Sequence, residues 1–88
     1  MPIQVAVLDD EPDILHLVTL HLERAGYLVD GYTDAKGFLQ SLDRKGPDLI
    51  ILDLMLPDSD GFDLCRYLKK DPRLSRIPVI MLTARTLE

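Results

Sequence analysis

The stretch Leu49-Ile50-Ile51-Leu52-Asp53 decides how this chain folds. Four apolar residues in a row leave no polar face, which is typical of a strand buried on both sides in a parallel sheet covered by helices. Asp53 ends the run, and an unpaired carboxylate at the rim of a buried strand is costly. The stretch therefore predicts a central parallel strand with a functional carboxylate at its carboxyl end.

Short apolar runs alternate with helical patterns along the rest of the chain. Strands are expected at residues 3–8, 27–32, 49–52 and 78–82, helices at residues 12–25, 35–42 and 62–70, and a loop at residues 54–61. The order β-α-β-α-β-α-β predicts an α/β fold with right-handed crossovers and a parallel sheet. Because only residues 83–88 follow the last strand, we expect this sheet to be incomplete.

Composition limits the function classes. Of the 88 residues, 47% are hydrophobic and 28% are charged, as in one small globular domain. A net charge of −5 argues against nucleic-acid binding by this segment. The single cysteine, Cys65, permits no internal disulfide, and no apolar stretch reaches the ~18 residues of a membrane span. Since no leader sequence is visible either, we expect a cytoplasmic protein without a membrane segment.

Acidic and hydroxyl residues follow three of the predicted strands. The first strand is followed by Asp9, Asp10 and Glu11, the third by Asp53 and the fourth by Thr83. Ligands bind beyond the carboxyl ends of strands in open parallel sheets, so we expect these side chains to meet there. Acids before a helix can also serve only its N-terminus, and this alternative stays open for residues 9–11.

Several carboxylates at one place repel one another unless a cation lies between them. Oxygen ligands with space for water favour Mg²⁺. A carboxylate beside such a metal can attack a phosphoryl group and form an acyl phosphate. The hydroxyl of Thr83 could then hydrogen-bond the new phosphoryl group. The sequence therefore predicts a Mg²⁺ site that supports phosphoryl transfer.

Three motifs resemble the receiver domains of bacterial two-component response regulators. They are Leu8-Asp9-Asp10-Glu11-Pro12, Leu52-Asp53-Leu54-Met55-Leu56-Pro57-Asp58-Ser59-Asp60-Gly61 and Met81-Leu82-Thr83-Ala84. Residues 66–85 are especially similar to receivers joined to winged-helix DNA-binding domains of the OmpR/PhoB type. The resemblance implies a flavodoxin-like (CheY-like), doubly wound sheet with strand order 2-1-3-4-5. Residues 1–88 would then form the N-terminal part of a receiver with order 2-1-3-4, without the fifth strand and the last two helices.

The resemblance also implies a role for each residue of the site. Asp53 is the phospho-acceptor, Asp53 and Asp10 bind Mg²⁺ directly, and Asp9 acts through a bound water. The remaining roles belong to the Met55 backbone carbonyl as a metal ligand, to Thr83 as the switch hydroxyl, to Met55 and Ala84 in tuning phosphoryl lifetime, and to Pro57 and Gly61 in shaping the loop. The implied phospho-donor is a sensor histidine kinase.

The lysine that follows the fifth strand in this family has no counterpart in the chain. The four lysines are Lys36, Lys45, Lys69 and Lys70, and none of them follows a central strand. The site is therefore expected to be incomplete, and any phosphorylation to be slow.

Two other functions stay open at this point. An aspartyl-nucleophile phosphatase of the haloacid-dehalogenase type requires Asp-x-Asp after its first strand, whereas this chain has Asp9-Asp10-Glu11. A catalytically silent fragment that chiefly self-assembles is the second alternative. With the fourth strand at the sheet edge, an apolar run with unpaired backbone groups invites pairing with another chain, which predicts a homodimer or larger homo-oligomer.

Overall fold

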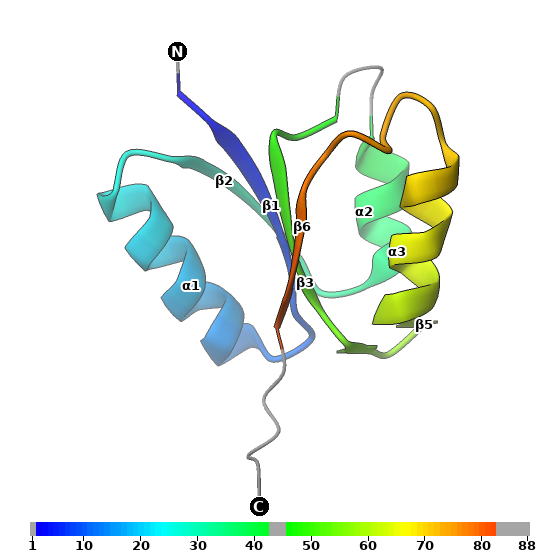
Figure 1. Cartoon of the computed structure of the whole chain (residues 1–88). Coiled ribbons are helices and arrows are strands. Elements are labelled where there is room, and N and C mark those ends of the chain that lie inside the picture. Colours follow the sequence, from blue (N-terminus) through cyan, green and yellow to red (C-terminus); the bar gives the residue numbers. More distant parts are fainter. Residues whose placement is uncertain (1, 43–45, 83–88) are drawn as a thin grey trace, which may run out of the picture.

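The computed structural model describes residues 2–42 and 46–82, and its centre is a parallel sheet of four strands (Figure 1). The strands are β1 (Gln4–Leu8), β2 (Leu28–Tyr32), β3 (Leu49–Asp53) and β6 (Val79–Leu82), in the order β2-β1-β3-β6. The helices are α1 (Pro12–Arg24), α2 (Ala35–Ser41) and α3 (Gly61–Lys70). The predicted α/β fold and the order of its four strands are confirmed, and each predicted element differs by one residue at one end.

The two central strands carry the most apolar sequence. All residues of β1 after Gln4 are buried, and so are Ile50, Ile51 and Leu52 of β3. Both strands have a hydrogen-bonded neighbour on each side, with Leu8 of β1 level with Leu52 of β3. Unbroken apolar runs belong in this position because side chains on both faces of a central strand are covered.

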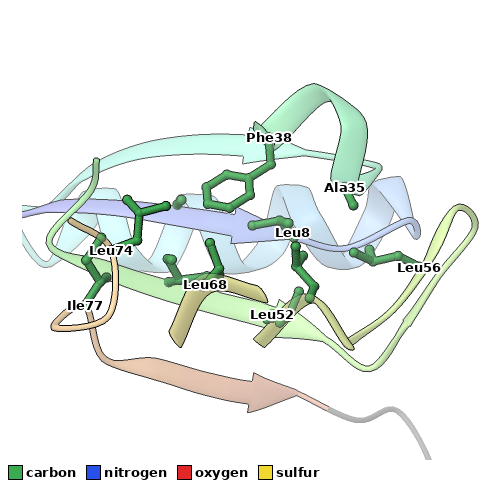
Figure 2. Close-up of a cluster of buried hydrophobic side chains, with 11 residues drawn as sticks. Leu8, Ala35, Phe38, Leu52, Leu56, Leu68, Leu74 and Ile77 are labelled. Atoms are coloured by element: carbon green, nitrogen blue, oxygen red, sulfur yellow. The ribbon is translucent and has the colours of Figure 1, made fainter. Parts of the chain in front are cut away.

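Helices cover the two faces of the sheet unequally, with α1 on one face and α2 and α3 on the other (Figure 1). The larger core lies between the sheet and the pair α2 and α3, and Figure 2 shows it around Phe38, Leu8, Leu52 and Leu68. On the α1 face, only Val5, Val7 and Ile51 form a buried cluster. No residue of α1 itself is buried, so this face is the less completely covered one.

The stretch after Asp53 differs from the prediction. The sequence indicates a loop at residues 54–61, but the structure has a short antiparallel hairpin of β4 (Met55–Leu56) and β5 (Ser59–Asp60). Pro57 and Asp58 form its turn, and Leu56 is buried in the larger core. Strands of two residues are too short to produce a recognisable alternation, which is why the pattern did not reveal them.

Within residues 2–42 and 46–82, no helix combines the length and the apolar character that crossing a membrane requires.

Candidate metal site

Three carboxylates meet at the carboxyl ends of two neighbouring strands. Asp9 and Asp10 follow β1, Asp53 ends β3, and one carboxylate oxygen from each lies within 4.8 Å of the others. The pairing of Leu8 with Leu52 causes this convergence, because it sets the ends of β1 and β3 side by side. The parallel sheet thus brings together the acids that the sequence singles out, apart from Glu11, which is exposed at the N-cap of α1.

Asp9 is the buried member of this cluster, with only 4% of its surface exposed. Its Oδ1 accepts a hydrogen bond of 2.9 Å from the main-chain N–H of Glu11. Burial raises the pKa of the Asp9 carboxyl above its ordinary value, the Glu11 bond opposes this rise, and the negative charges of Asp53 and Asp10 add to it. The charged form of Asp9 is therefore disfavoured in its present surroundings, and a cation at the cluster would favour it.

Asp53 is half-buried, and Asp10 is exposed to solvent. The main-chain N–H of Met55 donates a hydrogen bond of 3.1 Å to Oδ1 of Asp53, which holds the Asp53 side chain against the first residue of β4. Carboxylates that are partly open to water are the donor set that Mg²⁺ prefers, since this ion keeps several water ligands. The residues present therefore fit a magnesium ion.

The backbone at the end of the hairpin lies close to the backbone of Asp53 and Leu54, and Gly61 makes this contact possible. The main-chain N–H of Gly61 donates a hydrogen bond of 2.8 Å to the carbonyl of Leu54. A Cβ at position 61 would lie 2.7 Å from Cα of Leu54 and 2.8 Å from the carbonyl oxygen of Asp53. Both neighbours are backbone atoms, so only glycine fits without displacing the chain beside Asp53.

The other predicted site residues lie in or beyond this hairpin. The side chain of Met55 is 69% exposed, and Pro57 is exposed in the turn. Thr83 and Ala84 lie outside the described residues. Lys69 donates to the carbonyls of Ser75 and Ile77, which precede β6 and so lie at the opposite end of this strand from the acid cluster.

The sequence did not single out Asp58. Its carboxylate accepts hydrogen bonds from the main-chain N–H groups of Ala35 at 2.8 Å and Lys36 at 3.0 Å, the first two residues of α2. These partners lie 23 and 22 residues away along the chain, so no local pattern indicates the contact. An aspartate in a proline-containing turn was the one available signal, and it predicts only a turn.

Comparison with known proteins places the chain in a family. The chain matches the response regulator receiver domain family over residues 5–88. It is 48% identical over 82 residues to the DNA-binding dual master transcriptional regulator RpaA of Synechocystis sp., which covers 92% of this chain and 34% of RpaA. It is 39% identical over 85 residues to the alkaline phosphatase synthesis transcriptional regulatory protein PhoP of Bacillus subtilis, which covers 97% of this chain and 35% of PhoP.

Solved structures agree in fold. The N-terminal domain of a response regulator receiver protein from Methanoculleus marisnigri has a TM-score of 0.87 at 36% identity, covering 98% of this chain and 70% of that one. The response regulator DrrB of Thermotoga maritima, an OmpR/PhoB homologue, has a TM-score of 0.83 at 32% identity, covering 99% and 38%. The chain spans about a third of the length of the curated relatives that it matches. It belongs to the receiver-domain family of two-component response regulators.

Proposed function

We propose that this chain is the phospho-accepting segment of a response regulator, with Asp53 as the acceptor and a sensor histidine kinase as the donor. The observation that carries the proposal is the meeting of three carboxylates, within 4.8 Å of one another, at the ends of β1 and β3. A structural role for these acids accounts poorly for the burial of Asp9 beside two like charges.

Mg²⁺ is the cofactor in this proposal. Asp10, Asp53 and the backbone carbonyl of Met55 would hold the ion, and Asp9 would act through a water ligand. When bound, the ion neutralises charge on the phosphoryl oxygens during transfer. The three carboxylates of the described cluster supply oxygen ligands, which magnesium prefers.

The acceptor step follows from the chemistry of Asp53. A carboxylate oxygen of Asp53 attacks the phosphorus of a phosphohistidine, forming an O–P bond as the N–P bond breaks. The electron pair of the broken bond returns to the histidine nitrogen, and Asp53 becomes an acyl phosphate. The Met55 N–H bond to Oδ1 restricts the orientation of the attacking carboxylate. The chain thus serves as a phospho-acceptor for signalling, with at most weak self-phosphorylation and self-dephosphorylation.

The output belongs to the same proposal. RpaA and PhoP are named as transcriptional regulators, so we infer that phosphorylation here regulates transcription in the cytoplasm through a DNA-binding domain outside this chain. With a net charge of −5, this segment is not itself the nucleic-acid-binding part. Thr83 would be the switch hydroxyl, Ala84 would tune phosphoryl lifetime with Met55, and Pro57 and Gly61 would shape the acceptor loop.

Intact-mass spectrometry tests the acceptor directly. We expect incubation with acetyl phosphate and Mg²⁺ to add one phosphoryl group, and Asp53→Asn to abolish the addition. The matched control is Asp63→Asn, which removes an exposed acid on α3 and should leave the addition intact. The reaction should be slow, because none of the four lysines of this chain follows a central strand. Loss of one such preorganised donor to the transferring group costs ~10²–10³-fold in rate. Modification that persists in Asp53→Asn would identify a different acceptor.

Self-association is the second proposal, and the edge of the sheet favours it. Among the strands of the described residues, β6 is an outer one and has no charged residue, and Ile80 within it is 49% exposed. On the face of the sheet that α1 covers, no residue of this helix is buried. A second copy could pair along β6 and cover both features in a closed two-fold interface. Self-association through this surface does not require phosphorylation of Asp53.

Light scattering at micromolar concentration tests self-association. We expect a dimer or larger assembly that Ile80→Lys dissociates. Leu28→Lys is the matched control, since Leu28 is 50% exposed on β2, the opposite edge strand. A monomeric unmodified chain would contradict the proposal, and so would an Ile80→Lys variant that assembles as before.

A further inference from the structure

The carboxylate of Asp58 connects two parts of the molecule that are distant in sequence. Asp58 lies in the turn between β4 and β5, while its two donors, the N–H groups of Ala35 and Lys36, begin α2. The two oxygens of the carboxylate are divided between the donors, Oδ1 to Ala35 and Oδ2 to Lys36. The hairpin is thereby held to the helix by two charge-assisted hydrogen bonds.

Asp58 supplies part of the hydrogen bonding at the N-terminus of α2. This helix has seven residues and no acidic side chain in its first turn, and such a short helix is marginal by itself. Its N-cap, Asp34, accepts a hydrogen bond of 2.7 Å from the N–H of Gly37. Asp58 accepts from the two preceding N–H groups, so two carboxylates satisfy three of the free donors at this helix end. These bonds hold the pKa of the Asp58 carboxyl below its ordinary value.

The same hairpin carries the Met55 carbonyl, and its other attachments lie beside the acid cluster. At its base, the Gly61 N–H bonds to Leu54, and the Met55 N–H bonds to Asp53. At its tip, Asp58 bonds to α2. Met55 is therefore placed between an anchor on the phospho-acceptor strand and an anchor on a helix.

We propose that Asp58 is a positioning residue that holds the hairpin bearing the Met55 carbonyl and so links Mg²⁺ binding at the acid cluster to the N-terminus of α2. The inference rests on the proposed function, because it concerns the metal site. Coupling between two sites is reciprocal in free energy. If the Asp58 contact strengthens Mg²⁺ binding by some factor, Mg²⁺ must strengthen the Asp58 contact by the same factor.

A purely structural role makes a different prediction. If Asp58 only capped α2, its loss would expose the Ala35 and Lys36 amides and lower the unfolding temperature, without changing the hairpin or the metal. A positioning role also loosens the Gly61 amide at the base of the hairpin and weakens Mg²⁺ binding. Amide exchange and metal titration together therefore separate the two roles.

The experiment compares the unmodified chain with Asp58→Ala and Asp58→Asn. Amide hydrogen exchange is followed by NMR with and without Mg²⁺, and Mg²⁺ affinity is measured by calorimetry. We expect Asp58→Ala to weaken Mg²⁺ binding by about tenfold, as loss of a supporting residue behind a metal ligand does. Asp58→Asn keeps one acceptor oxygen and should lie between Asp58→Ala and the unmodified chain. In the unmodified chain, Mg²⁺ should slow amide exchange at Ala35 and Lys36, although neither residue is a predicted Mg²⁺ ligand.

Glu23→Gln is the matched control, because it removes an exposed negative charge near the C-terminal end of α1. It should leave both the affinity and the exchange rates unchanged. Unchanged Mg²⁺ affinity in Asp58→Ala, with faster exchange only at Ala35 and Lys36, would overturn the inference and leave the proposed function intact. Absence of Mg²⁺ binding in the unmodified chain would instead overturn the proposed metal site, and the linkage with it.

Discussion

The main-chain N–H of Met55 donates a hydrogen bond of 3.1 Å to Oδ1 of Asp53, so the proposed phospho-acceptor also organises the chain that follows it. The bond is local, since its two residues are only two positions apart in the chain, and it forms at the junction of β3 and β4. A side chain at position 53 thus has two separable properties. One is the negative charge and nucleophilic oxygen, and the other is the acceptor that holds Met55.

Substitutions at Asp53 should separate these two properties. Asp53→Asn and Asp53→Ala should both abolish phosphorylation, because neither offers a carboxylate. Asparagine keeps an amide oxygen that can accept from Met55, whereas alanine does not. We therefore expect the Met55 amide to exchange faster in Asp53→Ala than in Asp53→Asn, as measured by NMR. Equal exchange rates in the two variants would show that the bond does not restrain Met55.

Asp10→Ala should affect stability in opposite directions with and without metal. Removing one of three carboxylates within 4.8 Å relieves repulsion, so the metal-free variant should be more stable. The gain should stay below about 1 kcal/mol, because Asp10 is exposed and its charge is screened.

With Mg²⁺ the order should reverse, since a ligand that binds the native state stabilises it more when it binds more tightly. Thermal unfolding in EDTA and in a Mg²⁺ series measures both effects, and calorimetry gives the affinities. Equal Mg²⁺ affinity in the variant and the unmodified chain would remove Asp10 from the site.

Gly61→Ala should destabilise the fold and displace the backbone of Asp53, the proposed acceptor. The added Cβ would meet Cα of Leu54 at 2.7 Å and the carbonyl of Asp53 at 2.8 Å, and neither backbone atom can turn away. Overpacking of this kind costs about 1–3 kcal/mol of unfolding free energy. Urea denaturation measures the loss.

Gly31→Ala is the comparison, because the three atoms nearest to a Cβ there are side-chain atoms of Leu15, at 3.1–3.3 Å. The Leu15 side chain can shift, so the effect should be smaller. A Gly61→Ala variant as stable as Gly31→Ala would contradict the close approach.

The Asp58 contact should make part of the stability depend on pH. Hydrogen bonds from Ala35 and Lys36 lower the pKa of Asp58 in the folded chain, relative to about 3.9 in the unfolded chain. A lowered carboxyl pKa means that the contribution is fully present above the unfolded value and is lost as pH falls through the folded value. Unmodified chain and Asp58→Asn should therefore differ in unfolding temperature at neutral pH and converge in acid.

The informative quantity is the difference in unfolding temperature between the unmodified chain and Asp58→Asn at each pH. Asp71, beside Arg73, also has a lowered pKa and contributes acid sensitivity of the same sign in both. A constant difference between the unmodified chain and Asp58→Asn down to about pH 3 would mean that the charge of Asp58 does not stabilise α2.

Local patterns were sufficient for most of the fold. The apolar runs at β1 and β3 predict central strands because a side chain's need for burial is visible in the sequence itself. Gly26, with a φ of 98°, follows α1 as a glycine stop should. The acids after β1 and β3 were expected to converge since parallel strands direct their carboxyl ends to one edge.

What required the tertiary structure were the contacts between segments remote in sequence. The sequence identified Asp9, Asp10 and Asp53, but burial of Asp9 and the resulting rise of its pKa depend on how the neighbouring elements enclose it. The attachment of Asp58 to the first turn of α2 depends on where packing sets the hairpin against that helix. Hydrophobic periodicity reports which side of an element is buried, but it does not specify which element packs against that side. A hydrogen bond needs a donor and an acceptor within about 3 Å, and only the packing of the chain sets that distance.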